Sequence, residues 1–90
     1  MKYQLANHVS FTEVDDEAVL LDLNSGAYFG LNHVGALLLT HLQNKQSIEF
    51  AQQQIAAKYQ ISDTIVEQDI EALLAQLLEQ KLIVDYADGE

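Results

Sequence analysis

The spacing of apolar residues changes once along this chain of 90 residues, and this change constrains the fold more than any other feature. In residues 8–12 every second residue is apolar, an acidic turn follows at residues 15–17, and an apolar run resumes at residues 18–23. Such alternation is typical of β-strands that bury one face. From Asn32 onward, apolar residues recur every three or four positions, which is the spacing of one helix face. This order predicts strands first and helices afterwards.

The second and third strands are predicted to form a hairpin around residues 24–26, where a glycine can take the positive φ that a three-residue loop needs. In that register Leu21 faces Phe29 across the hairpin. Val19 likewise faces Leu31. The face with these four side chains is predicted to cover the core. The opposite face is predicted to carry Leu20, Asp22, Tyr28 and Gly30.

Three helices are predicted after the third strand, with N-caps at Asn32, at Ser47 and at either Ser62 or Thr64. The first covers about residues 33–43, and the third has the broadest apolar stripe. Residues 82–84 are predicted to form a brief final strand or an extended plug. The fold class is therefore predicted as α+β, a winged helix-turn-helix in which a three-stranded antiparallel sheet precedes three helices. At this length, residues 1–90 are expected to be one domain.

The charge balance excludes several classes of partner. The chain has 14 acidic and 4 basic residues, a formal net charge of -10, and no Arg. Because phosphate groups are bound largely by Lys and Arg, nucleic acid and anionic membrane surfaces are not expected as partners, and a basic partner is favoured. No apolar run approaches the roughly 20 residues that span a bilayer, no signal peptide is visible, and there is no Cys. We expect a cytoplasmic protein.

Catalysis is not expected, and neither is a metal or other cofactor. The histidines His8, His33 and His41 lack the spacing of a metal site on one strand or helix face. The glycines at residues 26, 30 and 35 match neither the phosphate-binding loop nor the dinucleotide fingerprint. What remains is a sheet edge: an outer strand of three is open to an added strand unless the third helix covers it. The sequence leaves both arrangements open.

Residues 19–39 contain an ordered pattern: a strand ending in Leu-Asp, a hairpin with Gly, an aromatic strand ending in Leu-Asn, then Gly and an aliphatic helix. This pattern resembles the PqqD-like family, also called the precursor peptide recognition element of ribosomally synthesised, modified peptides. Tyr59, Asp69 and residues 77–84 extend the likeness to about residues 8–84. The chain is most similar to the stand-alone members from lasso peptide biosynthesis. The resemblance implies a non-catalytic module that binds the leader of a precursor peptide as an antiparallel strand.

The resemblance also implies which residues bind the leader and which proteins act next. The partners would be a leader peptidase and a macrolactam-forming cyclase on separate chains. Asp69 would pair with a basic leader residue, and Tyr28 is favoured for ligand contact because it lies opposite the predicted core face. Core packing is favoured for Phe29 and Leu31, which face the apolar side of the hairpin, and it is the alternative for Leu73 and Leu77. The implied leader-binding residues are Ala27, Tyr28, Phe29, Gly30, Leu31, Asp69, Leu73, Gln76 and Leu77.

Three alternatives to this function are considered. The first is a PqqD-type chaperone that presents a precursor peptide to a radical SAM enzyme. The second is a winged-helix DNA-binding regulator, which the acidic residues Glu67, Asp69, Glu71 and Glu79 of the third helix disfavour. The third is a structural subunit that pairs with itself through the same edge.

Overall fold

A computed structural model describes residues 2–15 and 17–85 of the chain. Three antiparallel strands, β2 (Val9–Val14), β3 (Glu17–Asp22) and β4 (Tyr28–Leu31), form one sheet in the order β2-β3-β4. The helices α1 (His33–Gln43), α2 (Ile48–Tyr59) and α3 (Asp63–Glu79) follow. The predicted α+β class, with three strands before three helices, is confirmed.

The helices begin where side chains cap them. The Asn32 side chain accepts a hydrogen bond from the Gly35 N–H at 3.0 Å. The Ser47 hydroxyl oxygen accepts from the Phe50 N–H at 3.1 Å, and that of Ser62 accepts from the Ile65 N–H at 3.3 Å. Each bond satisfies an N–H that has no partner inside its helix. The caps at Asn32 and Ser47 are confirmed, and Ser62 rather than Thr64 caps α3.

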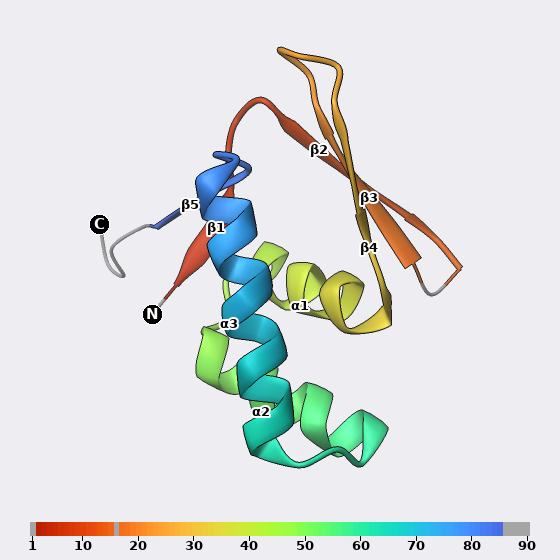
Figure 1. Ribbon diagram of the computed structural model, residues 1–90, viewed down its shortest axis with the longest axis vertical. Helices are drawn as coiled ribbons and strands as arrows, with labels where there is room; N and C mark the ends of the chain where they lie inside the picture. The colour runs from red at the N-terminus through yellow and green to blue at the C-terminus, as the bar shows by residue number, and fades with distance from the viewer. Residues whose placement is uncertain (1, 16, 86–90) are drawn as a thin grey trace.

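A second, two-stranded sheet joins the two ends of the described chain. Strand β1 (Tyr3–Leu5) pairs antiparallel with β5 (Ile83–Asp85), so that Gln4 lies opposite Val84. The final strand was one of two predicted alternatives, whereas β1 was not predicted. Both strands are short, and besides pairing with each other β1 contacts α1 and β5 contacts α3. Figure 1 shows this pair on the far side of α3 from β4.

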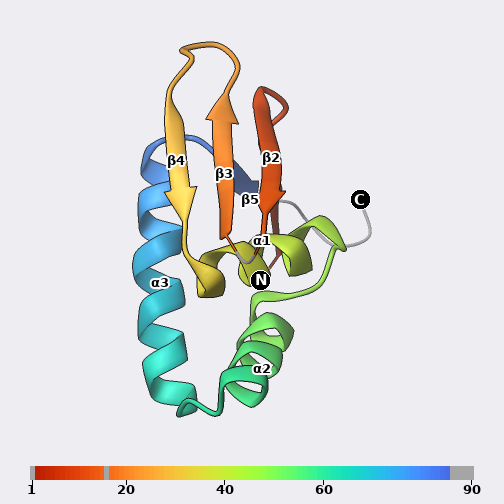
Figure 2. The same ribbon diagram turned by 90° about the vertical axis from the view of Figure 1, so that its right-hand side faces the viewer.

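The core lies between the three-stranded sheet and the helices. Helix α1 packs against β3 and β4, and Figure 2 shows α1 and α3 behind the sheet. Apolar side chains from every layer are buried together, and no charged or polar side chain is buried among the described residues. The largest fully buried side chains are Leu20, Leu38, Leu39, Leu42, Ile55, Ile70, Leu77, Ile83 and Val66.

The predicted register of the β3–β4 hairpin is wrong by one residue. Leu20 lies opposite Phe29, and Leu21 lies opposite Tyr28. Because side chains alternate between the two faces of a strand, this slip moves all of β3 to the other face. Leu20 is fully buried, whereas Leu21 is half-buried on the opposite face. For β4, the prediction that Phe29 and Leu31 face the core and Tyr28 faces away is confirmed.

The cause of this shift is a loop that is one residue longer than predicted. The Asp22 N–H donates to the Ala27 carbonyl oxygen at 2.9 Å, so the ladder closes at this pair and four residues remain in the loop. Gly26 has a φ of 80°, as predicted for the glycine of the loop. The Gly26 N–H donates to the Asp22 carbonyl oxygen at 2.7 Å.

Candidate functional site

Strand β4 forms one edge of the three-stranded sheet. It pairs with β3 on one side, and within residues 2–15 and 17–85 no strand pairs with its other side. Figure 2 shows β4 as the outermost strand, with α3 running alongside it and behind. An edge strand exposes backbone N–H and C=O groups that a further strand can bind.

The backbone groups that point away from β3 can be assigned from the ladder. In an antiparallel pair, residues alternate between those that hydrogen-bond to the neighbouring strand and those whose N–H and C=O point away from it. Since Asp22 and Ala27 are a bonded pair, Phe29 and Leu31 also direct their backbone groups toward β3. Tyr28 and Gly30 therefore direct theirs toward the open edge.

A groove lies beside this edge, and we call it the β4–α3 groove. Its volume is about 350 Å³, and it is bounded by β4, by the start of α1 and by one side of α3. Phe29 and Leu31 supply apolar side chains from the sheet, and Leu73 supplies one from α3. The residues that line it are Phe29, Gly30, Leu31, Asn32, Val34, Gly35, Asp69, Ala72, Leu73 and Gln76. The groove can accept apolar side chains from a strand that adds to β4.

Gly35 sets how closely the elements around the groove approach one another. A Cβ atom at this position would lie 3.1 Å from Cδ2 of Leu31 and 3.2 Å from Cδ2 of Leu73. These distances are shorter than ordinary van der Waals contacts, so a side chain at residue 35 would push against both walls. The glycine thus allows the first turn of α1 to sit between β4 and α3.

The charge of the groove is negative. Asp69 is the one charged residue among the described residues that line it. Other carboxylates on the same helix, those of Glu67 and Glu71, are exposed near Asp69. With a net charge of -10 on the whole chain, this environment attracts cationic groups and repels anionic ones.

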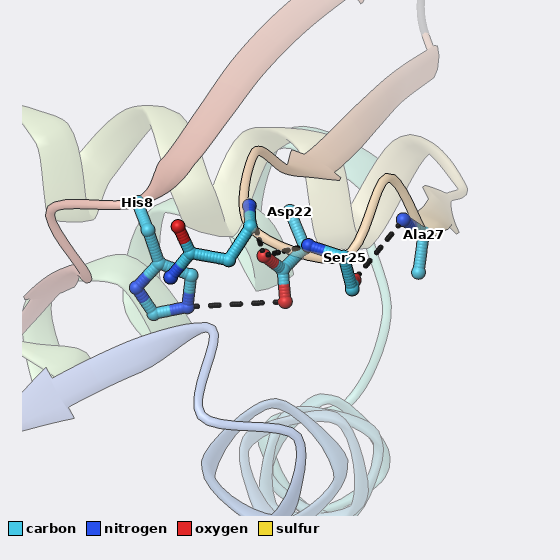
Figure 3. A network of polar contacts seen from close by, with 5 residues as sticks. His8, Asp22, Ser25 and Ala27 are labelled. Carbon is cyan, nitrogen blue, oxygen red and sulfur yellow. Dashed lines mark hydrogen bonds and ion pairs between the residues drawn. The ribbon is translucent and has the colours of Figure 1, made fainter.

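A polar network holds the loop at the start of β4 (Figure 3). Asp22 Oδ1 accepts from the backbone N–H of Asn24 at 2.9 Å and of Ser25 at 3.2 Å, and the Ala27 N–H donates to Oγ of Ser25 at 3.2 Å. The pKa of the Asp22 carboxyl is lowered, first by the Asn24 N–H bond, against a smaller opposing effect of burial. Asp22 Oδ2 also lies 3.9 Å from Nε2 of His8. This network fixes where β4 begins.

Of the nine residues that the resemblance implies, the structure brings six together in the β4–α3 groove: Phe29, Gly30, Leu31, Asp69, Leu73 and Gln76. Ala27 lies just before β4, and Tyr28 is 74% exposed on the opposite face of the sheet. Leu77 is fully buried in the core, which was the alternative considered for it, whereas Leu73 is half-buried at the groove wall.

Four lining residues were not among those implied: Asn32, Val34, Gly35 and Ala72. The helical glycine at residue 35 carried a usable signal, since glycine inside a helix often marks a close approach of another element. Val34 and Ala72 carried none, because apolar residues on a helix do not indicate by themselves which neighbour they face.

Two further kinds of feature are absent from the described residues. No three His, Cys, Asp or Glu side chains lie close enough to hold a metal ion there. None of the helices in residues 2–15 and 17–85 is long and apolar enough to cross a membrane.

Comparisons with known proteins agree with this geometry. Residues 17–83 match the sequence family described as coenzyme PQQ synthesis protein D, PqqD. A solved structure of TbiB1 in complex with the TbiA(beta) leader peptide is 34% identical, with a TM-score of 0.84 over 94% of this chain and 99% of that one. A lasso peptide synthetase B1 complexed with the leader peptide is 30% identical, also with a TM-score of 0.84, over 94% and 100% of the two chains. No curated protein sequence matches significantly.

Proposed function

This chain belongs to the PqqD family of precursor peptide recognition elements, and from that membership we propose that it is a non-catalytic module that binds the leader of a ribosomal precursor peptide. In this proposal residues 8–84 act as one domain. The leader adds as an antiparallel strand to β4, and the module delivers the precursor to separate modifying enzymes.

The observation that carries the proposal is the open edge of β4 beside a groove. Tyr28 and Gly30 offer two N–H and two C=O groups at this edge, and each hydrogen bond to a peptide contributes about 0.5–1.5 kcal/mol net. About four such bonds would contribute roughly 2–6 kcal/mol, whatever the peptide sequence. Side chains in the groove are then needed to reach micromolar affinity, about -8 kcal/mol.

The same geometry predicts how the leader side chains are distributed. Side chains of the added strand alternate between the two faces of the extended sheet. Leader residues opposite Phe29 and Leu31 would enter the β4–α3 groove, where Leu73 offers apolar contact and Asp69 attracts a Lys or Arg. Leader residues opposite Tyr28 and Gly30 would lie on the other face. Backbone hydrogen bonds to β4 would thus supply affinity for any leader, and the side chains of the groove would supply selectivity among leaders.

Lasso peptide biosynthesis is the pathway that we favour for this module. Both solved structures named above hold a leader peptide, and one of them is a lasso peptide synthetase B1. The following enzymes would then be a leader peptidase and a macrolactam-forming cyclase. The second candidate is a chaperone of the PqqD type that presents its peptide to a radical SAM enzyme, which the match to the PqqD family supports.

The experiment that tests the proposal is a titration of the protein into a fluorescent leader peptide from the neighbouring precursor gene. We expect saturable binding with a Kd in the micromolar range or below, and no saturable binding to a peptide of the same composition in scrambled order. Equal affinity for both peptides would indicate mere charge attraction, and absence of binding to the true leader would refute the proposal.

A further inference from the structure

A second cavity lies near the end of the sheet where β4 begins, and we call it the α3–β5 pocket. Its volume is about 440 Å³, compared with about 350 Å³ for the β4–α3 groove. It lies between the last turn of α3, strand β5 and the segment that leads from β1 to β2. None of its residues is assigned to leader binding above. Six of the residues that line it are Ala6, Asn7, His8, Leu78, Lys81 and Val84.

The walls of the α3–β5 pocket are partly apolar. The Leu78 side chain is 40% exposed and that of Val84 is 41% exposed, although both are large apolar residues. Asn7 and His8 add polar side chains from the segment before β2. Apolar walls with a few polar groups are typical of ligand-binding pockets. The pocket can therefore take an apolar side chain of a ligand.

The charge of the α3–β5 pocket is opposite to that of the β4–α3 groove. Lys81 lies in the pocket, and none of the described residues that line it is an Asp or a Glu. Within residues 2–15 and 17–85, no carboxylate forms an ion pair with the Lys81 ammonium. In the groove the charged residue is Asp69. A carboxylate beside an apolar side chain therefore suits the pocket, and a basic side chain suits the groove.

The α3–β5 pocket lies close to where a peptide strand on β4 would end. Figure 2 shows β4 and α3 running in opposite directions, so a strand antiparallel to β4 runs in the direction of α3 and leaves beside Tyr28. At this end of the sheet, His8 Nε2 lies 3.9 Å from Asp22 Oδ2 (Figure 3). Asp22 in turn pairs with Ala27, directly before β4. The pocket wall at His8 thus adjoins the loop from which β4 begins.

A few residues of peptide are enough to reach the pocket from the edge of β4. Neighbouring strands lie about 4.8 Å apart, so β2 is about 10 Å from β4 and about 15 Å from a strand added beyond β4. One extended residue covers about 3.3 Å, so about four or five residues reach from the added strand to the level of His8, which directly precedes β2.

We propose that the α3–β5 pocket binds the part of the precursor peptide that follows the leader strand, through an apolar residue and a neighbouring Asp or Glu. The inference rests on the proposed function, because the leader strand on β4 brings this segment to the pocket. The Lys81 ammonium would pair with the carboxylate, and Leu78 and Val84 would contact the apolar side chain.

The opposite charges of the two cavities would also fix the direction of the peptide. Asp69 lies in the first half of α3, and Lys81 follows its C-terminal end. A peptide that runs in the direction of α3 would therefore present a basic residue first and an acidic residue later. The reverse direction would place like charges together at both cavities, which disfavours it.

Even a weak contact in the pocket would count, because the leader strand tethers the segment. A short flexible connection gives a local concentration of about 1 mM. A contact with an intrinsic Kd of about 0.1 mM would then raise the affinity for the whole peptide about tenfold.

The test uses two peptides and two lysine variants. One peptide is the shortest piece of the leader that still binds, and the other is the whole precursor from the same gene. Lys81 has a φ of 61°, which glycine adopts without strain, so Lys81→Gly removes the ammonium and keeps the backbone. Lys45→Gly is the matched control, because Lys45 has a φ of 62° and lies outside both cavities.

We expect the wild type to bind the whole precursor about tenfold more tightly than the short peptide. Lys81→Gly should reduce this gain to twofold or less while the Kd for the short peptide stays within twofold, and Lys45→Gly should preserve the gain. Replacing the acidic residues after the leader strand by their amides should also remove the gain. In NMR spectra, the methyl signals of Leu78 and Val84 should shift with the whole precursor and not with the short peptide.

The inference is overturned, with the proposed function intact, if the wild type binds both peptides equally well or if the gain survives Lys81→Gly. Methyl signals of Leu78 and Val84 that stay in place on addition of the whole precursor would also overturn it. Failure of the wild type to bind either peptide would refute the proposed function itself.

Discussion

Replacing Tyr28 by proline tests the open edge of β4 most directly. The Tyr28 N–H points away from β3, so its loss leaves the hydrogen bonds between β3 and β4 in place. Proline lacks this N–H, and its ring occupies the space where a peptide strand would lie. The Tyr28 side chain is 74% exposed and lies outside the core, so the folded protein should tolerate the change.

The expected loss can be worked out from the hydrogen bonds. One bond at the edge contributes about 0.5–1.5 kcal/mol, and the peptide carbonyl that loses its donor in the interface costs about 1–3 kcal/mol more. The sum is roughly 1.5–4.5 kcal/mol, and since about 1.4 kcal/mol corresponds to a factor of ten, the Kd should rise about 10-fold to 1,000-fold or more. For a leader bound at about 1 μM, this change raises the Kd to somewhere between roughly 10 μM and 1 mM.

The other edge of the sheet supplies the matched control. Glu13 on β2 is exposed, lies opposite Ala18 and, by the same alternation, directs its N–H away from β3. Glu13→Pro thus removes an outward N–H from the edge that the leader is not expected to use. Fluorescence anisotropy with a labelled leader should show strong loss for Tyr28→Pro and little change for Glu13→Pro, with both variants folded by circular dichroism. Equal affinities for the two variants would refute β4 as the peptide-binding edge.

Four further changes test the groove, the loop and the core. Asp69→Lys should slow the association of a basic leader at low salt, measured by stopped-flow fluorescence, and unchanged rates would remove this carboxylate from the site. Gly35→Ala places a Cβ 3.2 Å from Leu73 Cδ2, so titration with the leader peptide should give a severalfold higher Kd. The free energy of unfolding from calorimetry should change by less than about 1 kcal/mol, because alanine favours the helix. The pKa of Asp22 is lowered on folding, so the contribution of this carboxylate to stability is present above the ordinary pKa of 3.8 and is lost as the pH falls through the folded pKa. Asp22→Asn should therefore make the free energy of unfolding depend less on pH in the acid range. An unchanged pH profile of unfolding would contradict this linkage. Leu20→Ala should cost about 2–5 kcal/mol in urea unfolding because the side chain is fully buried, and a loss below about 1 kcal/mol would contradict the register.

Sequence reasoning predicted the local elements of the fold well. The change of period at Asn32 located the boundary between strands and helices, and the capping residues Asn32 and Ser47 located two helix starts to the residue. These features depend on neighbours within one or two turns of chain, so the necessary information lies close together in the sequence. The outward position of Tyr28 followed from the same alternation and is confirmed.

The candidate site was predicted less completely, because its walls come from three elements. Phe29, Asp69, Leu73 and Gln76 were implied by the family resemblance, and they lie in one groove. The broad apolar stripe of α3 did not distinguish Leu73 at the groove wall from Leu77 in the core, since the two residues are four apart on one helix face. Their difference depends on the angle at which α3 crosses the sheet, and helix periodicity carries no information on that angle.

From the residues themselves one could derive which segments are strands or helices and where helices start, and the acidic composition led us to expect a basic partner. Only the tertiary structure determined the rest. The β1–β5 pair joins residues about 80 positions apart, and the register of β3 with β4 goes with a four-residue loop that the hydrogen bond from the Asp22 N–H to the Ala27 carbonyl oxygen closes. A shift of one residue exchanges the two faces of a strand. The length of the loop between β3 and β4 therefore decides which side chains of β3 face the core and which face the solvent.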